Sequence, residues 1–392
     1  MSNNNQTRDG ILLAANWDSN VGYAWWLMES YWLVLAGFSG KKYTCHLCYP
    51  EISVLPEAVL ASSLVVHKIS FIDKSTSSLL EQINFIRENR VRVIYFTDQP
   101  SFQIRYAFYR LFGVKIIINH DHTPGRRTRP SGLKKHIKTL LNRAPFFTLD
   151  AQIGVTSYVK ERIISVNCFP KKKTFIVPNG IRVTDLQEPI AKFFDVRSLY
   201  SIPEDRQIIV TTSRAHLYKG IDFALRCIAK MLKEHPDMKL HYLFCGGGPH
   251  LDMFLEKAKQ LGISEYVTMP GSMTNMSDIL SECQIAFHPS HGEVGYSLSI
   301  LEYMFAELPT LVPNNPSVCG ATIDGVTGLI YSDNDVDSAN RQLKLLLADE
   351  ALRRRIGINA KESVCAKYNL ERAHSELKKV FSAILSTKGL TT

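Results

Sequence analysis

Short runs of β-branched and aromatic residues alternate along this chain with longer segments whose apolar residues recur every three or four positions. This alternation predicts parallel strands joined by crossover helices. In the first half, strands are expected at residues 10–15, 43–48, 64–69, 91–96, 115–119 and 151–155, and helices at residues 24–36, 76–88 and 102–111. The turn Pro178-Asn179-Gly180 closes this half.

The second half repeats the pattern. Strands are expected at residues 207–213, 239–245, 267–269, 285–288, 310–313 and 328–331, and helices at residues 221–234, 250–261, 276–282, 298–306, 336–347, 350–367 and 370–385. The sequence therefore predicts an α/β protein with two Rossmann-like, doubly wound parallel sheets. We expect an N-terminal, acceptor-binding domain over residues 1–182, a nucleotide-binding domain over residues 183–370, and a final helix over residues 371–392 that returns to the N-terminal domain. Open parallel sheets bind ligands at the carboxyl ends of their strands, so we expect the site in a cleft between these edges.

Composition adds little to this picture. The 392 residues are 45% hydrophobic, 10% aromatic and 21% charged, which is ordinary for a globular protein. Without a long apolar run or a signal-peptide pattern, the sequence predicts a cytoplasmic protein. A peripheral position at the inner face of the cell membrane is expected from the basic segment 126–143. The eight cysteines are scattered, and the cluster Cys45-His46-Leu47-Cys48 lies in a strand-like run without a second ligand pair, so we interpret these as strand cysteines.

Charge is more informative. The net charge is +9, but residues 1–182 carry a balance of +12 and residues 183–392 a balance of −3. This asymmetry predicts that the first domain faces something anionic. The segment 126–143 alternates Arg and Lys with leucines, which suits an anionic membrane surface or a phosphorylated acceptor. A core-facing amphipathic helix with a solvated basic side remains the alternative. We expect no nucleic-acid partner.

Two clusters in the second half follow strands directly. In the first, Ser213 to Gly220, the cations Arg214 and Lys219 stand five residues apart at the start of a helix, an arrangement that can grip a diphosphate. A solvated loop with surface charges is the alternative. In the second, Cys245-Gly246-Gly247-Gly248-Pro249, glycines permit close backbone approach, although an ordinary strand-to-helix turn would look the same.

The third cluster is the richest and runs from Pro289 to Glu302. A strand ends at His288, a polar loop with glycines follows, and a helix is expected to start near Leu298. Loop amides and the positive end of that helix suit a pyrophosphate, and a carboxylate one turn further on can accept both hydroxyls of a ribose. Glu302 lies in an apolar stretch of that helix, where a carboxylate is costly without partners. Its partner is a bound ribose or, alternatively, a nearby lysine or arginine.

In the first half, Asn119-His120-Asp121-His122 ends a strand. A histidine held by an acidic neighbour can orient a substrate hydroxyl or transfer a proton. Clustered His and Asp can also bind a metal, but without a further cluster nearby we expect no metal site.

The order and spacing of these clusters resemble the large retaining glycosyltransferase family 4, which has the GT-B architecture and includes bacterial polysaccharide and lipopolysaccharide transferases. The resembling features are Arg214 with Lys219-Gly220, the turn Gly246 to Pro249, Pro289-Ser290 through Glu302, Leu308-Pro309-Thr310, Asp324 to Leu329, and Pro178 to Ile181. The resemblance is strong over residues 150–385 and weaker in the first domain.

The resemblance implies roles for individual residues of the second domain. Arg214 and Lys219 would neutralise the donor diphosphate, Glu302 would bind the ribose and Glu293 would lie by the transferred sugar. The phosphates would lie against the turn at Gly246 and the backbone at Gly295, Tyr296, Ser297 and Leu298.

In the first domain, Gly22 resembles the phosphate-side loop of the family and His120 its cleft histidine. The expected catalytic group is therefore Glu293, His120, Arg214 and Lys219. The family usually needs no metal or cofactor, because positive side chains stabilise the leaving group.

One departure from the family pattern concerns the loop. The family places seven residues between its two glutamates, whereas eight lie between Glu293 and Glu302. Counted back from Glu302, the position of the first glutamate belongs to Val294. Ser297 stands where the family usually has glycine.

The leading hypothesis is a retaining hexosyltransferase that moves a sugar from a UDP- or GDP-sugar to a saccharide or lipid-linked acceptor in cell-surface glycan synthesis. A nucleotide-sugar 2-epimerase of the same architecture is one alternative. A non-catalytic, basic protein that binds membranes or nucleic acids is another.

Overall fold

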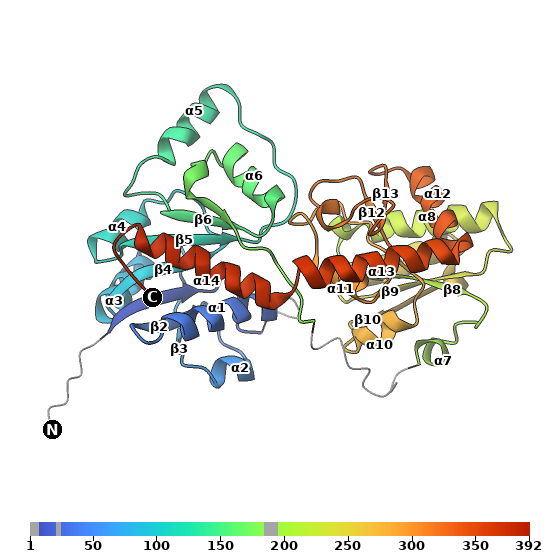
Figure 1. Ribbon diagram of the computed structural model, residues 1–392, viewed down its shortest axis with the longest axis horizontal. Coiled ribbons are helices and arrows are strands. Elements are labelled where there is room, and N and C mark those ends of the chain that lie inside the picture. The colour runs from blue at the N-terminus through green and yellow to red at the C-terminus, as the bar shows by residue number, and fades with distance from the viewer. Residues whose placement is uncertain (1–7, 21–24, 184–194) are drawn as a thin grey trace. The chain divides into compact units, whose positions relative to one another are not determined.

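The computed structural model describes residues 8–20, 25–183 and 195–392, and the chain folds into two compact units. Unit 1 contains Met1–Thr123, Arg127–Asn179 and Ala373–Thr392, and unit 2 contains Pro124–Arg126 and Gly180–Arg372. Figure 1 shows that each unit is a sheet with helices packed against it. The two units are described separately below.

Unit 1 is built on a parallel sheet of seven strands in the order β3-β2-β1-β4-β5-β6-β7. The strands are β1 (Asp9–Ala14), β2 (Tyr43–Tyr49), β3 (Val65–Lys68), β4 (Val91–Thr97), β5 (Ile116–Asp121), β6 (Ala151–Gly154) and β7 (Thr174–Ile176). The central strands β1, β4 and β5 are buried along almost their whole length. This explains their continuous apolar runs, because helices cover both faces of such a sheet.

The helices of unit 1 are α1 (Trp26–Ser39), α2 (Glu57–Leu60), α3 (Thr76–Glu88), α4 (Arg105–Leu111), α5 (Gly132–Leu141) and α6 (Ser157–Ser165), with most of α14 (Leu370–Ser386). Several start at a polar cap. Ser75 accepts a hydrogen bond from Ser78 N–H at α3, and Thr156 accepts one from Val159 N–H at α6. Helix α14 packs in this unit through Leu377 and Phe381, which are fully buried, and His374 lies 3.0 Å from the Ser30 hydroxyl.

Unit 2 is built on a second parallel sheet in the order β10-β9-β8-β11-β12-β13. Its strands are β8 (Gln207–Thr212), β9 (Leu240–Cys245), β10 (Val267–Gly271), β11 (Ile285–Phe287), β12 (Thr310–Pro313) and β13 (Leu329–Tyr331). Its helices are α7 (Val196–Tyr200), α8 (Ile221–Glu234), α9 (Leu251–Gln260), α10 (Met276–Ser281), α11 (Leu298–Phe305), α12 (Val336–Ala348) and α13 (Glu350–Lys367). The strand order reverses between β8 and β11, which makes this the topological switch point of the sheet.

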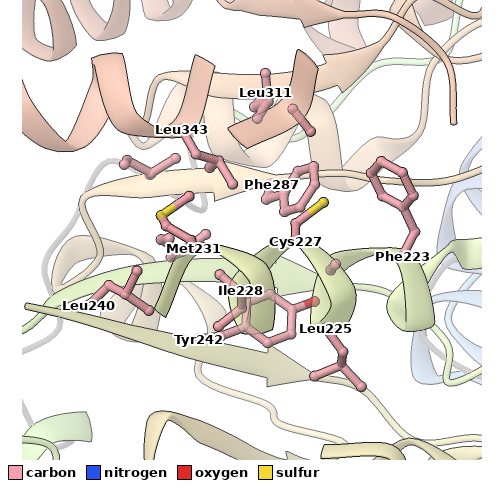
Figure 2. Close-up of a cluster of buried hydrophobic side chains, with 14 of the residues drawn as sticks. Phe223, Leu225, Cys227, Ile228, Met231, Leu240, Tyr242, Phe287, Leu311 and Leu343 are labelled. Atoms are coloured by element: carbon pink, nitrogen blue, oxygen red, sulfur yellow. The ribbon is translucent and has the colours of Figure 1, made fainter. Parts of the chain in front are cut away.

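The main core of unit 2 lies between α8 and the sheet. The apolar residues of α8 recur every three or four positions and therefore lie on the side of the helix that faces the strands. Figure 2 shows Phe223, Ile228 and Met231 pointing toward side chains from β9 and β11. Tyr242 and Phe287 close the cluster from the sheet side, and all of these side chains are at most 1% exposed. This packing fixes the carboxyl ends of β8, β9 and β11 relative to one another.

The expected fold class of two Rossmann-like parallel sheets is confirmed, and the predicted strands agree with the observed ones to within one or two residues at most ends. Among the predicted helices, α4 differs most at its start. Residues 102–111 were expected to be helical, but α4 begins at Arg105, because Phe102 forms a bridge with Thr148 and Gln103 N–H donates to the Phe147 carbonyl.

Candidate functional site

The loops after β8 and β11 leave the same edge of the unit 2 sheet at its switch point. The two strands are direct parallel neighbours, with Ile285 opposite Ile209 and Ala286 opposite Val210. His291 N–H donates to the Tyr218 carbonyl at 2.8 Å, which ties the second loop to the first. The first and third sequence clusters are therefore adjacent in space, where an open α/β sheet binds its ligand.

Two glycines allow the loops to approach this closely. Gly220 has a φ of +72°, and a Cβ there would lie 2.1 Å from the Pro289 carbonyl oxygen. At Gly246, after β9, a Cβ would lie 1.7 Å from the Ser213 carbonyl oxygen. Gly246 N–H also donates to the Gly271 carbonyl at 2.8 Å. A side chain at either position would push apart the backbone segments that carry the candidate site.

Replacing Gly246 with alanine is therefore expected to lower the free energy of unfolding by about 2 kcal/mol or more, because backbone must move to admit the Cβ. Urea unfolding checks this. The matched control is Gly37→Ala in α1, where a Cβ meets nothing within 4 Å. That substitution should be neutral or stabilising, since alanine favours a helix. Equal losses in both variants would contradict the close approach at Gly246.

A buried ion pair joins the two loops. Lys219 Nζ lies 2.5 Å from Glu293 Oε1, and the two side chains are only 12% and 8% exposed. His288 Nε2 lies 3.2 Å from the same oxygen. The His288 ring is 1% exposed and comes from the residue directly after β11. Charges removed from water in this way need close partners, and here each has at least one.

These contacts set the protonation of the cluster. Burial raises the pKa of Glu293, but the opposing effects of Lys219 and His288 are larger together and lower it to about 2. Burial lowers the pKa of His288, although the Glu293 carboxylate acts against this. At neutral pH the cluster therefore holds an ionised carboxylate and a neutral imidazole beside an ammonium group.

The N-terminus of α11 lies next to this cluster. Ser297 caps the helix by accepting a hydrogen bond from Ile300 N–H at 3.2 Å, and its hydroxyl lies 3.3 Å from His288 Nε2. Leu298, the first helical residue, has no carbonyl partner within the helix for its N–H, because the first turn of any helix leaves its amides free. These amides and the helix dipole attract an anion to this position.

The residues before Ser297 hold the loop in shape. Gly295 N–H donates to the Ser317 carbonyl at 2.7 Å, and its own carbonyl accepts from Gly320 N–H at 2.7 Å. Tyr296 packs its ring into the core against Tyr368, with the ring centres 5.1 Å apart. The amide of Gly295 is thus already used, so the available amides lie further along, at the start of the helix.

The two remaining predicted donor residues differ in exposure. Arg214, after β8, is exposed, and within the described part of the chain it forms no ion pair. Glu302 lies on the second turn of α11 and is 8% exposed. The next residue, Tyr303, bonds its hydroxyl to Thr212 Oγ1 at 2.8 Å, which anchors α11 to the end of β8.

In unit 1, His120 is the second-last residue of β5 and is completely buried. Its Nδ1 lies 2.7 Å from the Tyr95 hydroxyl, and burial lowers its pKa well below the usual value. The acidic neighbour Asp121 pairs instead with Arg162, at 3.0 Å. The His122 ring lies beside that of His120, tilted by 58°, with the ring centres 4.2 Å apart. The Tyr95 hydroxyl therefore orients the His120 ring, whereas the sequence predicted that an acidic neighbour would hold it.

Gly22 lies outside the described residues. Among the residues that the structure does describe, no group of three or more His, Cys, Asp or Glu is placed to hold a metal ion. Cys45 and Cys48 lie buried on β2, and burial raises the pKa of Cys45 to about 12.

The basic segment 126–143 contains α5. None of the ten residues of this helix is buried. The alternative of a core-facing amphipathic helix is therefore wrong. Over the described ranges, no helix combines the length and the apolar character needed to cross a membrane.

Sequence reasoning missed His288 and the capping role of Ser297. Both could have been found. A histidine next to a fully apolar strand and directly before a polar loop marks a candidate site residue, and a serine directly before an apolar helical run is a typical N-cap.

Known proteins that resemble this chain include glycosyltransferases. The family model described as "Glycosyl transferases group 1" matches residues 194–363. N-acetyl-alpha-D-glucosaminyl L-malate synthase of Bacillus anthracis is 27% identical over 186 residues, which are 47% of this chain and 48% of that protein. The chain spans about half the length of the first curated relatives it matches.

Two solved structures resemble the whole chain. A glycosyltransferase of Rickettsia africae has a TM-score of 0.76 at 13% identity and covers 96% of this chain and 99% of its own. HepE of Anabaena, in complex with UDP and glucose, has a TM-score of 0.74 at 12% identity and covers 96% and 100%. These likenesses show the GT-B fold. The family match and the relatives, which include glycosyltransferases of capsular polysaccharide and glycolipid synthesis, support a group 1 glycosyltransferase.

Proposed function

We propose that this chain transfers a hexose from a UDP- or GDP-sugar to a saccharide or lipid-linked acceptor, with retention of configuration. The observation that carries the proposal is the convergence of Lys219, Glu293 and the N-terminus of α11 at the switch point of the unit 2 sheet. A cation and free helix amides suit a diphosphate. UDP as the donor nucleotide is favoured by the complex of HepE with UDP and glucose.

The chemistry assigned to each group follows from charge. The bond between the sugar C1 and the diphosphate oxygen breaks, and a bond between C1 and an acceptor hydroxyl oxygen forms. The hydroxyl proton passes to the departing diphosphate, which suits attack from the same face and retention. Arg214 and Lys219 stabilise the negative charge that develops on the leaving group. Glu302 accepts the ribose hydroxyls.

Glu293 has a double role in this proposal. In the structure it neutralises Lys219 at 2.5 Å. A bound diphosphate competes for the same ammonium group, because both are anions that need a cation. The carboxylate is then available to the hydroxyls of the transferred sugar. What supports this role for Glu293, despite the extra residue in the loop, is its proximity to Lys219.

The sharpest test is donor binding followed by thermal unfolding. A nucleotide at about a hundred times its Kd stabilises the folded state by about 2.7 kcal/mol, which raises Tm by several degrees in a unit of this size. We expect UDP, or else GDP, to do so, with other nucleotides inactive. Arg214→Ala should weaken binding by roughly tenfold to a hundredfold, because a charge-assisted hydrogen bond contributes about 1.5–3 kcal/mol.

The matched control is Arg226→Ala, another exposed arginine of unit 2, which lies on α8 and pairs at the surface with Asp222. Its effect on nucleotide binding should be negligible. The proposal fails if no nucleotide or nucleotide sugar shifts Tm, or if both arginine variants bind equally well.

Product analysis separates the alternatives. A transferase gives an acceptor-dependent product whose anomeric configuration, read by NMR, matches that of the donor. A 2-epimerase would release an epimerised sugar without any acceptor. A non-catalytic binding protein would give neither. We also propose that no metal or cofactor is required, in which case EDTA leaves turnover unchanged.

A further inference from the structure

Helix α5 turns its apolar side away from the protein. Leu133 and Leu140 are 75% and 73% exposed, and Ile137 and Leu141 are exposed as well. The spacing of these four residues places them on one stripe of the helix. Phe146, which follows the helix, is 63% exposed. Figure 1 shows α5 at the periphery of unit 1.

The polar side of α5 faces the protein instead. Lys138 Nζ donates to the Val166 carbonyl at 3.1 Å. The side-chain amide of Asn142, at the end of the helix, is 5% exposed and donates to the Asn167 carbonyl at 2.7 Å. An ordinary surface helix buries its leucines and solvates its lysines. This helix is inverted, so the stripe is available to an apolar partner.

A pocket of about 420 Å³ lies between α5 and the end of α6. Three cations line it, Arg129, Lys135 and Arg143, together with Thr139, whose hydroxyl donates to the Lys135 carbonyl, and Ser165. Its described lining includes no Asp or Glu, although Arg129 also lies 3.5 Å from the exposed Glu161. Three cations around a volume of this size fit a phosphate-bearing headgroup.

Charge identifies the partner of the apolar stripe. Residues 122–149 contain seven Lys and Arg and no Asp or Glu. A stripe of leucines beside basic residues is typical of helices that lie in the interface of an anionic membrane. We propose that α5 lies in the plane of an anionic phospholipid membrane, with its leucine stripe inserted and a headgroup phosphate in the pocket between α5 and α6. Such docking would bring unit 1 to lipid-linked acceptors, but it does not depend on glycosyl transfer.

The test is cosedimentation of the full chain with vesicles of phosphatidylcholine alone or mixed with phosphatidylglycerol. We expect at least tenfold stronger binding to the anionic vesicles, which high salt reduces. The double variant Lys135→Gln/Arg143→Gln should bind about thirtyfold more weakly, because each cation contributes about 1 kcal/mol at such a surface. Leu133→Ser/Leu140→Ser should lose at least about tenfold, since two inserted side chains are removed.

Matched controls change exposed residues of unit 1 away from this surface. Leu60→Ser/Leu80→Ser removes leucines that are 65% and 61% exposed, and Lys41→Gln/Lys74→Gln removes two exposed cations. Both should bind vesicles like the unchanged protein. Because all of the substituted leucines are exposed, Tm should stay the same, and donor binding to unit 2 should be unaffected in every variant. Donor binding therefore reports separately on the proposed function.

Four results would overturn the proposal. Equal binding to neutral and anionic vesicles would contradict the binding of a headgroup phosphate in the pocket. Unchanged vesicle binding of the Leu133/Leu140 variant would mean that another face of the protein contacts the membrane. A dimer in gel filtration that this variant abolishes, without vesicle binding, would make a second copy the partner. A rise in Tm with inorganic phosphate that needs Lys135 and Arg143, again without vesicle binding, would make the pocket a site for free anions.

Discussion

Replacing Lys219 with alanine is expected to lower the free energy of unfolding of unit 2 by about 3 kcal/mol and kcat by about a hundredfold or more. The loss of stability arises because the Glu293 side chain is 8% exposed and, among the side chains of the described residues that pair with its carboxylate, would keep His288 at 3.2 Å but lose the ammonium group. An uncompensated buried carboxylate is costly. The loss of rate arises because the leaving diphosphate would lose a cation. Urea unfolding and steady-state kinetics measure the two effects.

The control for the ion pair is Lys230→Ala. Lys230 lies on α8 of the same unit and pairs with Asp337, but both side chains are largely exposed, at 40% and 61%. Removing an exposed pair changes stability by less than about 1 kcal/mol. If Lys219→Ala were no more destabilising than Lys230→Ala, the pair with Glu293 would not hold the two loops together.

A double variant separates stability from activity. Lys219→Met/Glu293→Gln removes both charges, so no unpaired ion is buried, and most of the lost stability should return. Activity should not return, because the leaving group still lacks its cation. A double variant that regained activity would exclude Lys219 from the reaction.

The second large effect is a loss of stability as the pH falls from about 6.5 to about 4. Burial lowers the pKa of His46, His122 and His241 to about 4. In the unfolded chain a histidine titrates near 6.5, so below that pH the unfolded state takes up protons that the folded state does not. The stability that these neutral histidines contribute is fully present above about pH 6.5 and is lost as the pH falls to their folded pKa of about 4. His122 alone would contribute about 3 kcal/mol.

Two carboxyls modify this profile. Burial raises the pKa of Asp98 to about 7, so its contribution to stability is greatest at low pH and is lost as the pH rises toward 7. It therefore opposes the histidines over the same range. The pKa of Glu293 is lowered to about 2, so the stability that its carboxylate contributes is lost only below the usual glutamate pKa of about 4.3, where protonation begins to break the pair with Lys219. The net result is a steady loss on acidification, followed by a further loss below about pH 4.

Urea midpoints measured from about pH 7.5 to about pH 4.5 test this profile. His122→Gln should flatten the curve for unit 1, because a glutamine does not titrate. His136→Gln removes an exposed histidine of α5 and should leave the slope unchanged. A pH dependence that is the same in both variants would mean that His122 is not the group responsible.

The sequence by itself determined the two Rossmann-like sheets and the region of the candidate site. Apolar runs such as those of β4 and β5 identify strands buried on both faces, because only such strands need side chains without polar atoms on either side. The clusters around Lys219 and Glu293 follow strands directly, and in a parallel sheet such loops lie at one edge. The location of the candidate site could therefore be predicted from the order of strands and loops along the chain alone.

Only the tertiary structure decided which groups are partners. Periodicity does not reveal that His288 and Lys219 converge on one oxygen of Glu293, because these contacts join residues from separate loops. It also does not reveal that His120 is bonded to Tyr95 while Asp121 pairs with Arg162. The same holds for α5. Its sequence showed an amphipathic helix, but the direction of the apolar stripe depends on what packs against the helix, and only the fold shows that Leu133 and Leu140 point outward.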